Sequence, residues 1–207
     1  MSSSIPKSAI AGVVLAGGQG RRLGGVDKAL IELGGQSLVE RVTLRLAPQV
    51  ERLAINANGE PERFDPLGYP VISDREFDDV GPMAGVTSAL DWADDLGFDW
   101  VATAAVDTPF FPLDLVARLS EIEGDKVRMA ATALSGLHPT FALWPTSIRR
   151  EMRDMVQQGA RRVRKVAEEF GVEVVPFAEQ TPPPFFNVNT QEDLDLARPI
   201  VADINGD

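Results

Sequence analysis

The sequence predicts one α/β domain in which helices cover both faces of a mostly parallel sheet. Strand-like apolar runs alternate with amphipathic helical patterns along the 207 residues, which is the order typical of three-layer α/β/α folds. Hydrophobic residues make up 44% and charged residues 25% of the chain, as in ordinary globular domains. No internal repeat, low-complexity tract or linker interrupts the alternation. We therefore expect a Rossmann-like domain at 9–201, a flexible N-terminus at 1–8 and a flexible C-terminus at 202–207.

Seven short apolar runs have the length and β-branched content of strands. The first is rich in valine and isoleucine and ends at a glycine-rich loop, and the fourth is the clearest central strand. The predicted strands are 10–16, 52–58, 69–73, 100–106, 129–134, 140–144 and 173–177.

The intervening segments have helical periodicity and recognisable end signals. Ser37 and Glu40 form a capping-box pattern before an apolar stripe at Val39, Val42 and Leu46. The other predicted helices are 81–92, a segment starting near Pro112, 147–158, 161–170 and 190–198. Glycines stop two of these helices at 159 and 171, and Pro199 is expected to end the last one.

The composition excludes several classes of protein. The formal net charge of −11 argues against a broad nucleic-acid surface, although one basic loop can still hold a nucleotide. No apolar run approaches 18 residues and the first eight residues are polar, so we expect neither a membrane span nor a signal peptide. The absence of cysteine excludes disulfides and thiolate metal sites. We expect a cytoplasmic monomer.

The loop at 17–28, directly after the first predicted strand, has the chemistry of a polyphosphate site. It contains five glycines, whose backbone can approach a ligand closely, together with Arg21, Arg22 and Lys28. Leu23 stands where the dinucleotide fingerprint needs its third glycine, and no Gly-Lys-Ser/Thr follows as in a P-loop. The sequence thus predicts phosphate binding by a loop that matches neither of these two common motifs.

Polar side chains follow three further predicted strands, where ligands of parallel sheets bind. Asn56 and Asn58 follow the second strand, Asp74 the third, and Asp107 the central one. A carboxylate beside a phosphate site suits Mg²⁺, which prefers oxygen ligands and is commonly shared with substrate phosphates. Asp107 can alternatively be a turn starter, because Asp-x-Pro is common in turns.

Together these motifs resemble those of the molybdenum cofactor guanylyltransferases. The first motif alone is shared by many nucleotidyltransferases, but the full set follows the order of this family from Ile10 to Ala197. The matching segments are Leu15-Ala16-Gly17-Gly18 with Arg22-Leu23-Gly24-Gly25 and Asp27-Lys28, Ile55-Asn56-Ala57-Asn58, Val71-Ile72-Ser73-Asp74, Gly81-Pro82-Met83-Ala84-Gly85, Asp107-Thr108-Pro109, His138-Pro139-Thr140, Gly159-Ala160-Arg161-Arg162-Val163 and Asn187-Val188-Asn189-Thr190.

The resemblance implies transfer of GMP from GTP to the terminal phosphate of molybdopterin, with or without molybdenum, and release of pyrophosphate. Catalysis would rest on Arg22, Lys28 and Asp107, and Asp107 would hold Mg²⁺. Asp74 would accept hydrogen bonds from either guanine or ribose. The implied GTP-binding residues are Leu15, Ala16, Gly17, Gly18, Arg22, Lys28, Asn56, Asp74, Gly85 and Asp107.

The resemblance places Arg161, Asn187 and Asn189 on the acceptor side. If 187–189 is extended, Asn187 and Asn189 project to the same side, although they can alternatively satisfy a strand-to-helix turn. The cluster around Arg161 can alternatively be a solvated helix face. We assign the single histidine, His138, no acid–base role and expect Phe185 and Phe186 to belong to the core.

Two other functions remain open. One is transfer of another nucleotide or to another small acceptor, as by a molybdopterin cytidylyltransferase; the Ala16-Gly17-Gly18 sequence favours guanine. The other is a non-catalytic, nucleotide-dependent partner of a molybdoenzyme, which the presence of both Lys28 and Asp107 argues against. The resemblance also implies protein partners: cofactor-carrier proteins that deliver the acceptor, or molybdoenzymes that receive the cofactor.

Overall fold

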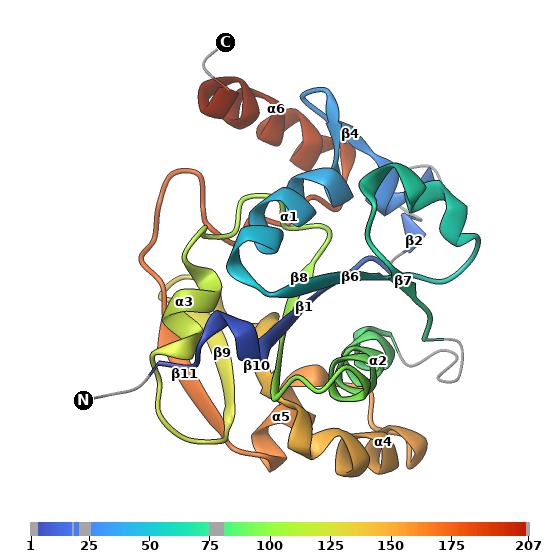
Figure 1. The fold of residues 1–207 in the computed structure, drawn as a ribbon. Coiled ribbons are helices and arrows are strands. Elements are labelled where there is room, and N and C mark those ends of the chain that lie inside the picture. Colours follow the sequence, from blue (N-terminus) through green and yellow to red (C-terminus); the bar gives the residue numbers. More distant parts are fainter. Residues whose placement is uncertain (1–3, 18, 21–25, 75–80, 206–207) are drawn as a thin grey trace.

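The fold is organised around one seven-stranded sheet (Figure 1). The computed structural model describes residues 4–17, 19–20, 26–74 and 81–205. The strands lie in the order β11-β9-β10-β8-β1-β6-β7. Their bounds are β1 (Ile10–Leu15), β6 (Arg52–Asn56), β7 (Val71–Ile72), β8 (Trp100–Ala105), β9 (Val127–Thr132), β10 (Gly136–Pro145) and β11 (Val172–Pro176).

The sheet is mostly parallel, as predicted. β1 pairs in parallel with β6 on one side and β8 on the other, with Val14 opposite both Ile55 and Ala104. β6–β7 and β11–β9 are also parallel pairs. Among the described strands of this seven-stranded sheet, only β10 runs antiparallel to its neighbours. The carboxyl ends of β7, β6, β1 and β8 therefore meet at one edge of the sheet.

Helices cover both faces of the sheet, which confirms the three-layer prediction (Figure 1). α1, α3 and α6 pack on one face, and α2, α4 and α5 on the other. Their bounds are α1 (Leu38–Leu46), α2 (Pro82–Asp95), α3 (Leu115–Ser120), α4 (Arg149–Gln157), α5 (Val163–Glu169) and α6 (Gln191–Asn205). Short elements complete the fold: β2 (Gln19–Gly20), β3 (Val26–Asp27), β4 (Glu32–Leu33), β5 (Gln36–Ser37) and the 3₁₀ turns η1 (Lys7–Ala9), η3 (Lys28–Leu30), η4 (Ala47–Gln49), η5 (Pro61–Leu67) and η7 (Thr146–Ile148).

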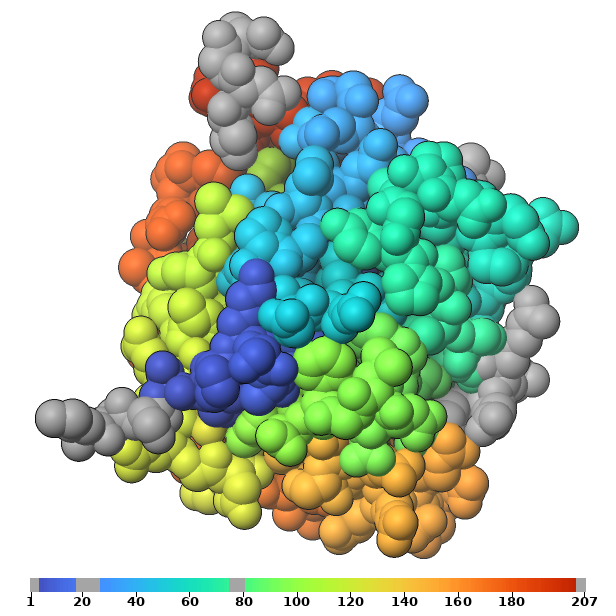
Figure 2. All heavy atoms as spheres, viewed as in Figure 1, coloured from blue at the N-terminus to red at the C-terminus, as the bar shows by residue number. Residues whose placement is uncertain are grey.

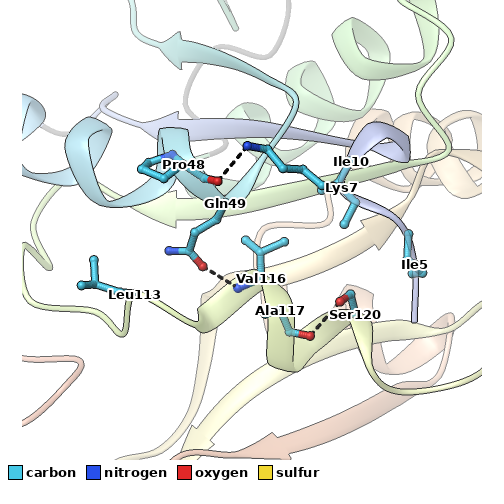
Figure 3. Close-up of a pocket in the computed structure, with 9 residues that line it drawn as sticks. All are labelled: Ile5, Lys7, Ile10, Pro48, Gln49, Leu113, Val116, Ala117 and Ser120. Atoms are coloured by element: carbon cyan, nitrogen blue, oxygen red, sulfur yellow. Dashed lines mark hydrogen bonds between the residues drawn. The ribbon is translucent and has the colours of Figure 1, made fainter. Parts of the chain in front are cut away.

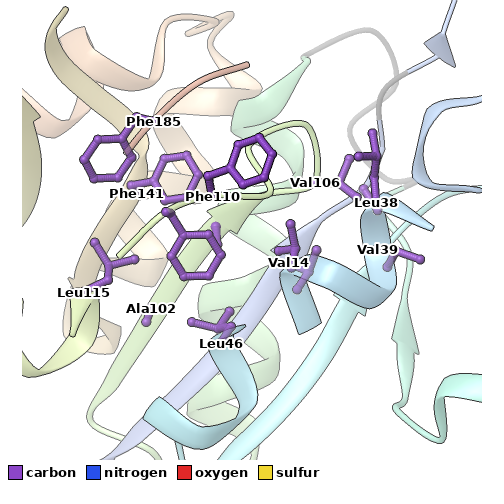
Figure 4. Packing of buried hydrophobic residues seen from close by; sticks show 14 of the residues in the cluster. Val14, Leu38, Val39, Leu46, Ala102, Val106, Phe110, Leu115, Phe141 and Phe185 are labelled. Atoms are coloured by element: carbon purple, nitrogen blue, oxygen red, sulfur yellow. The ribbon is translucent and has the colours of Figure 1, made fainter. Parts of the chain in front are cut away.

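The alternation of side chains along β1 divides the core between these faces. Ile10 and Val14 belong to the cluster under α1, α3 and α6, whereas Val13 and Leu15 belong to the cluster under α2, α4 and α5. Figure 4 shows the first cluster, in which Phe110 and its neighbours fill the space between the sheet and α1. Because β1 is buried on both faces, it reads as a continuous apolar run.

The predicted capping box at the start of α1 is confirmed. The Ser37 N–H donates to Glu40 Oε2 at 2.6 Å, and the Glu40 N–H donates to Ser37 Oγ at 3.3 Å. The Ser37 hydroxyl, which donates to Glu40 Oε2 at 2.7 Å, and the Ser37 N–H both lower the pKa of the Glu40 carboxyl, with the hydroxyl as the largest cause. The cap fixes where α1 begins.

The prediction that Pro199 ends the last helix is wrong. α6 continues through Pro199 to Asn205. A proline inside a helix costs roughly 3 kcal/mol, but the following turn buries Val201, which is 1% exposed and extends the stripe begun by Leu194 and Ala197. Val201 packs on Gly34, where a Cβ would lie only 2.3 Å from Val201 Cγ1. Tertiary packing therefore overrides the local stop signal.

A cavity of about 370 Å³ lies at the start of β1, where Ile5 and Lys7 meet η4 and α3 (Figure 3). Lys7 Nζ donates to the Pro48 carbonyl there at 2.8 Å. The polar residues singled out above follow the opposite end of β1, so this cavity is not part of the candidate site. Over the described ranges, no helix is long and apolar enough to span a membrane.

Candidate functional site

The site is built where β1, β6, β7 and β8 end. Main-chain bonds continue the sheet beyond the strands at this edge: the Ala16 N–H donates to the Asn56 carbonyl at 2.8 Å and the Val106 N–H to the Leu15 carbonyl at 3.1 Å. The Leu15 carbonyl and the Ala16 N–H are thus hydrogen-bonded to neighbouring segments of the sheet, whereas Gly17 is exposed. The sheet therefore brings the predicted strand-end residues together and leaves Gly17 open to a ligand.

Lys28 lies at the centre of one half of the site. Its Nζ donates to Asp107 Oδ2 at 2.9 Å and to Asn189 Oδ1 at 2.5 Å. The Lys28 side chain is only 10% exposed and that of Asp107 is 27% exposed, so solvent screens this pair partially. Three residues that are distant in sequence and were all predicted for the site thus form one cluster.

Thr108 extends this cluster toward Asn187. Its hydroxyl donates to Asn187 Oδ1 at 2.5 Å and lies 3.1 Å from Asp107 Oδ1. The Val188 N–H donates to the Asp107 carbonyl at 2.7 Å, and Val188 is completely buried. The segment is not a regular strand, but Asn187 and Asn189 both bond to this cluster, as the alternation predicts.

The entry of α6 supports Asn189. Asp193 Oδ2 accepts from the N–H groups of Asn189 and Thr190, both at 2.8 Å. The Asp193 N–H donates to Thr190 Oγ1 at 3.2 Å, which completes a capping box. The pKa of Asp193 is lowered, chiefly by the Asn189 N–H, and the charge of Lys28 contributes. The alternative that the asparagines satisfy a strand-to-helix turn is therefore wrong, because their side chains bond to Lys28 and Thr108. Thr190 and Asp193 satisfy the local main chain instead.

The other half of the site lies between β6, β7 and α2. Asn56 is 1% exposed, and its Nδ2 donates to the Ile72 carbonyl at 3.3 Å. A Cβ at Gly85 would lie 2.5 Å from Asn56 Oδ1, so glycine lets α2 approach this amide. A Cβ at Gly17 would lie 3.8 Å from Asp74 Oδ2 and 3.9 Å from Asn56 Oδ1. Four of the predicted residues therefore surround one small region.

Asn58 fixes the orientation of Asp74. Asn58 Oδ1 accepts from the Asp74 N–H at 3.2 Å and from the Ser73 hydroxyl at 2.9 Å, while its Nδ2 donates to Asp74 Oδ1. Asp74 is 8% exposed. This carboxylate thus sits at the end of β7 with Oδ2 on the side of Gly17.

Of the other predicted site residues, two lie outside the described residues and one borders a separate cavity. Gly18 and Arg22 lie outside the described residues. Arg161 borders a cavity of about 330 Å³ together with Arg162 and Lys165, and donates to the carbonyls of Ala160 at 3.1 Å and Val156 at 3.4 Å. The acceptor role of Arg161 therefore stays a prediction, and Arg161 borders a basic cavity that the Lys28 cluster does not line.

His138 is partly buried and packs on the aromatic core, and the absence of an acid–base role stays a prediction. Its ring stacks on Phe185 with 4.2 Å between ring centroids, and burial lowers its pKa. Phe185 is 6% exposed and also contacts Phe141 at 5.0 Å. The expectation that Phe185 is a core residue is therefore confirmed.

The oxygen atoms around Lys28 are of the kind that bind a hard cation shared with substrate phosphates. Carboxylate and amide oxygens of Asp107 and Asn189 already hold the ammonium of Lys28. Among the described residues, no three acidic, histidine or cysteine side chains form a group that could hold a metal alone. Mg²⁺ commonly binds through one or two carboxylates plus substrate phosphates, and Asp107 fits that requirement.

Known proteins resemble this chain over most of its length. Residues 12–174 match the family described as MobA-like NTP transferase domain. The chain is 46% identical over 192 residues to a molybdenum cofactor guanylyltransferase of Mesorhizobium japonicum, covering 89% of this chain and 92% of that one. It is 40% identical to a protein of the same name from Nitrobacter hamburgensis, covering 92% and 94%. The crystal structure of molybdopterin-guanine dinucleotide biosynthesis protein A from Archaeoglobus fulgidus aligns with a TM-score of 0.73 at 25% identity, covering 93% and 99%.

Proposed function

The chain belongs to the family of MobA-like NTP transferase domains, and on this premise we propose that it transfers GMP from GTP to molybdopterin. An oxygen of the acceptor's terminal phosphate attacks the α-phosphorus of GTP. The bond from that phosphorus to the β-phosphate bridging oxygen breaks, and pyrophosphate leaves. The product is a molybdopterin guanine dinucleotide.

The observation that carries this proposal is the cluster of Lys28, Asp107 and Asn189 at the carboxyl edge of the sheet. It joins a residue of the glycine-rich segment, one at the end of β8 and one from the predicted acceptor segment. A nucleotide bound along Gly17 and an acceptor bound at Asn187 and Asn189 would therefore meet beside Lys28. Such positioning is the main source of catalysis in phosphoryl and nucleotidyl transfer.

Each half of the site has a distinct part in the reaction. Lys28 would move from Asp107 to the phosphates and neutralise the charge that develops on pyrophosphate. Asp74 would accept hydrogen bonds from guanine or ribose, with Asn56 beside it. We infer no covalent enzyme intermediate, because no nucleophilic side chain is needed between these halves.

We propose that Asp107 holds Mg²⁺ when the nucleotide is bound. The ion would shield the triphosphate charge from the incoming acceptor phosphate. The carboxylate can take this role because Lys28 and Thr108 contact it only through side chains, and a ligand can replace such contacts.

Pyrophosphate release tests the proposal. The assay uses GTP, CTP and ATP, each with and without molybdopterin, and with Mg²⁺ or EDTA. We expect release only with GTP, acceptor and Mg²⁺. Release with CTP instead would favour a cytidylyltransferase, and GTP binding without any release would favour a non-catalytic partner.

A further inference from the structure

Arg63 links two parts of the site that are separate in sequence. It lies in η5, away from the strand ends that carry the predicted residues. Its Nε donates to Asp27 Oδ2 at 2.7 Å, and its Nη2 donates to the Asn58 carbonyl at 2.7 Å. In Figure 2 the atoms of η5 lie at the surface of the domain and adjoin those of α1 and the β4–β5 hairpin.

The Asp27 contact acts on Lys28. Asp27 caps η3, because its Oδ1 accepts from the Ala29 N–H at 3.0 Å, and Lys28 is the first residue of that turn. The same carboxylate therefore holds the turn with one oxygen and Arg63 with the other. The side chains of Arg63 and Asp27 are 23% and 28% exposed, so the pair is partly shielded from solvent.

The Asn58 contact acts on Asp74. Arg63 holds the main chain of Asn58, and the Asn58 side chain bonds to both the N–H and the carboxylate of Asp74. A displacement of Arg63 would therefore move Lys28 and Asp74 relative to one another.

The position of Arg63 is itself well defined. Its guanidinium lies 4.4 Å from the ring centroid of Phe64, which is fully buried. Gly59 has φ of +94°, and a Cβ there would lie 3.2 Å from Arg63 Nη1. A planar fork can serve Asp27 and Asn58 at once, whereas the single ammonium of a lysine lacks this geometry.

We propose that Arg63 is a positioning residue that sets the span between Lys28 and Asp74, and thereby the fit of the whole nucleotide. This inference rests on the proposed function for the assignment of the triphosphate to Lys28 and the nucleoside to Asp74. Arg63 itself touches neither ligand. Its effect is on how well both ends bind together.

Calorimetric titration of the full chain with GTP, GMP and tripolyphosphate tests this proposal. For Arg63→Ala we expect GTP affinity to fall about tenfold, because one ligand can no longer reach both ends optimally. Affinity for the separate fragments should fall by no more than about threefold, because each half remains intact. A merely structural loss would instead weaken all three ligands to the same degree.

Arg118→Ala is the matched control. Arg118 also lies over a phenylalanine ring, 4.1 Å from the Phe177 centroid, and donates to the Pro176 carbonyl. It has no contact with Asp27 or Asn58 in the part of the chain described, so we expect wild-type affinity for all three ligands. Asp27→Asn keeps the oxygen that caps η3 and loses the charge facing Arg63, and should reproduce the Arg63→Ala pattern even if that variant folds poorly.

GTP affinity within twofold of wild type in both Arg63→Ala and Asp27→Asn would overturn the proposal, as would equal losses for GTP and its fragments. Because the readout is binding, a wild-type chain that binds GTP but transfers no GMP would refute only the proposed function. A wild-type chain without GTP affinity would refute both, before any variant is compared.

Discussion

The two halves of the candidate site are held by different kinds of contact. On the nucleotide side, around Asn56 and Asp74, three side chains each have a main-chain partner: Asn56 bonds to the Ile72 carbonyl, Asn58 to the Asp74 N–H and Arg63 to the Asn58 carbonyl. The Asn58 amide also bonds to the Asp74 carboxylate and the Ser73 hydroxyl. On the transfer side, around Lys28, side chains bond to side chains: Lys28 donates to Asp107 and Asn189, and the Thr108 hydroxyl donates to Asn187. A main-chain partner is fixed by the fold, whereas a side-chain partner can be exchanged. The nucleotide side is therefore built to be rigid and the transfer side to change partners.

Asp107→Asn should have the largest effect and separate the two halves most clearly. The amide keeps an oxygen for Lys28 but lacks the charge needed for Mg²⁺. We expect kcat to fall about a thousandfold, with GTP affinity weakened less. Pyrophosphate release measured against Mg²⁺ concentration gives the rate, and calorimetry gives the affinity.

Asp114→Asn is the control for this charge change. Asp114 is an exposed carboxylate that makes no side-chain cap at the start of α3. It should leave the rate unchanged. A wild-type rate in Asp107→Asn with Mg²⁺ present would contradict the assignment of the metal to Asp107.

Asn189→Ala tests whether the transfer side faces the acceptor. Lys28 would keep Asp107 but lose the amide at 2.5 Å. We expect KM for the acceptor to rise about tenfold, the loss of roughly one hydrogen bond to a charged group, with GTP affinity unchanged. Steady-state kinetics at saturating GTP measures this, with the exposed neighbour Gln191→Ala as control. An increase in the Kd for GTP instead would place Asn189 on the nucleotide side.

Gly85→Ala tests the rigidity of the nucleotide side. The new methyl would lie 2.5 Å from Asn56 Oδ1, and that amide is buried with little room to move. We expect a loss of about 1–3 kcal/mol in the free energy of unfolding together with weaker GTP binding. Urea denaturation and calorimetry report the two effects. Ser88→Ala on the same helix should change neither, and unchanged GTP affinity in Gly85→Ala would show that this side is not rigid.

The smallest expected effect concerns His138, which stacks on Phe185 two residues before Asn187. Burial lowers its pKa in the folded state, so the unfolded chain binds a proton more readily as the pH falls through about 6.5. This histidine therefore destabilises the fold at pH 5.5 relative to pH 7.5. His138→Phe, which keeps a ring against Phe185, should reduce the difference between urea midpoints at these pH values. A difference as large as that of the wild type would contradict this cause.

The sequence predicted the strand ends better than the contacts between them. Apolar runs and the parallel-sheet rule placed Asn56, Asp74 and Asp107 at one edge, because each lies at the carboxyl end of a strand or two residues beyond it. The pairing of Lys28 with Asp107 depends on β1 lying beside β8, and this strand order is not encoded locally. The role of Arg63 was not predicted, since a single arginine in a 3₁₀ turn has neither periodicity nor a motif.

The prediction at Pro199 failed for a related reason. A proline is a strong local signal, but the burial of Val201 against Gly34 is a contact between distant segments. Local rules describe individual elements, whereas the end of α6 is decided by where the whole chain brings its hydrophobic stripe. For the same reason, local signals predicted the residues at the strand ends but not the contacts between distant segments that hold these residues.

The return of α6 to the hairpin after Lys28 also has a consequence for biosynthesis. A nascent chain leaves the ribosome N-terminus first, so Lys28 and Asp107 emerge long before Asn189 and Val201. A nascent chain can thus complete β1, β6 and β8, with all the residues of the nucleotide side, while Lys28 still lacks its second partner, Asn189. Asn187 and Asn189, which we propose to face the acceptor, therefore join the site only after most of the described chain has left the ribosome.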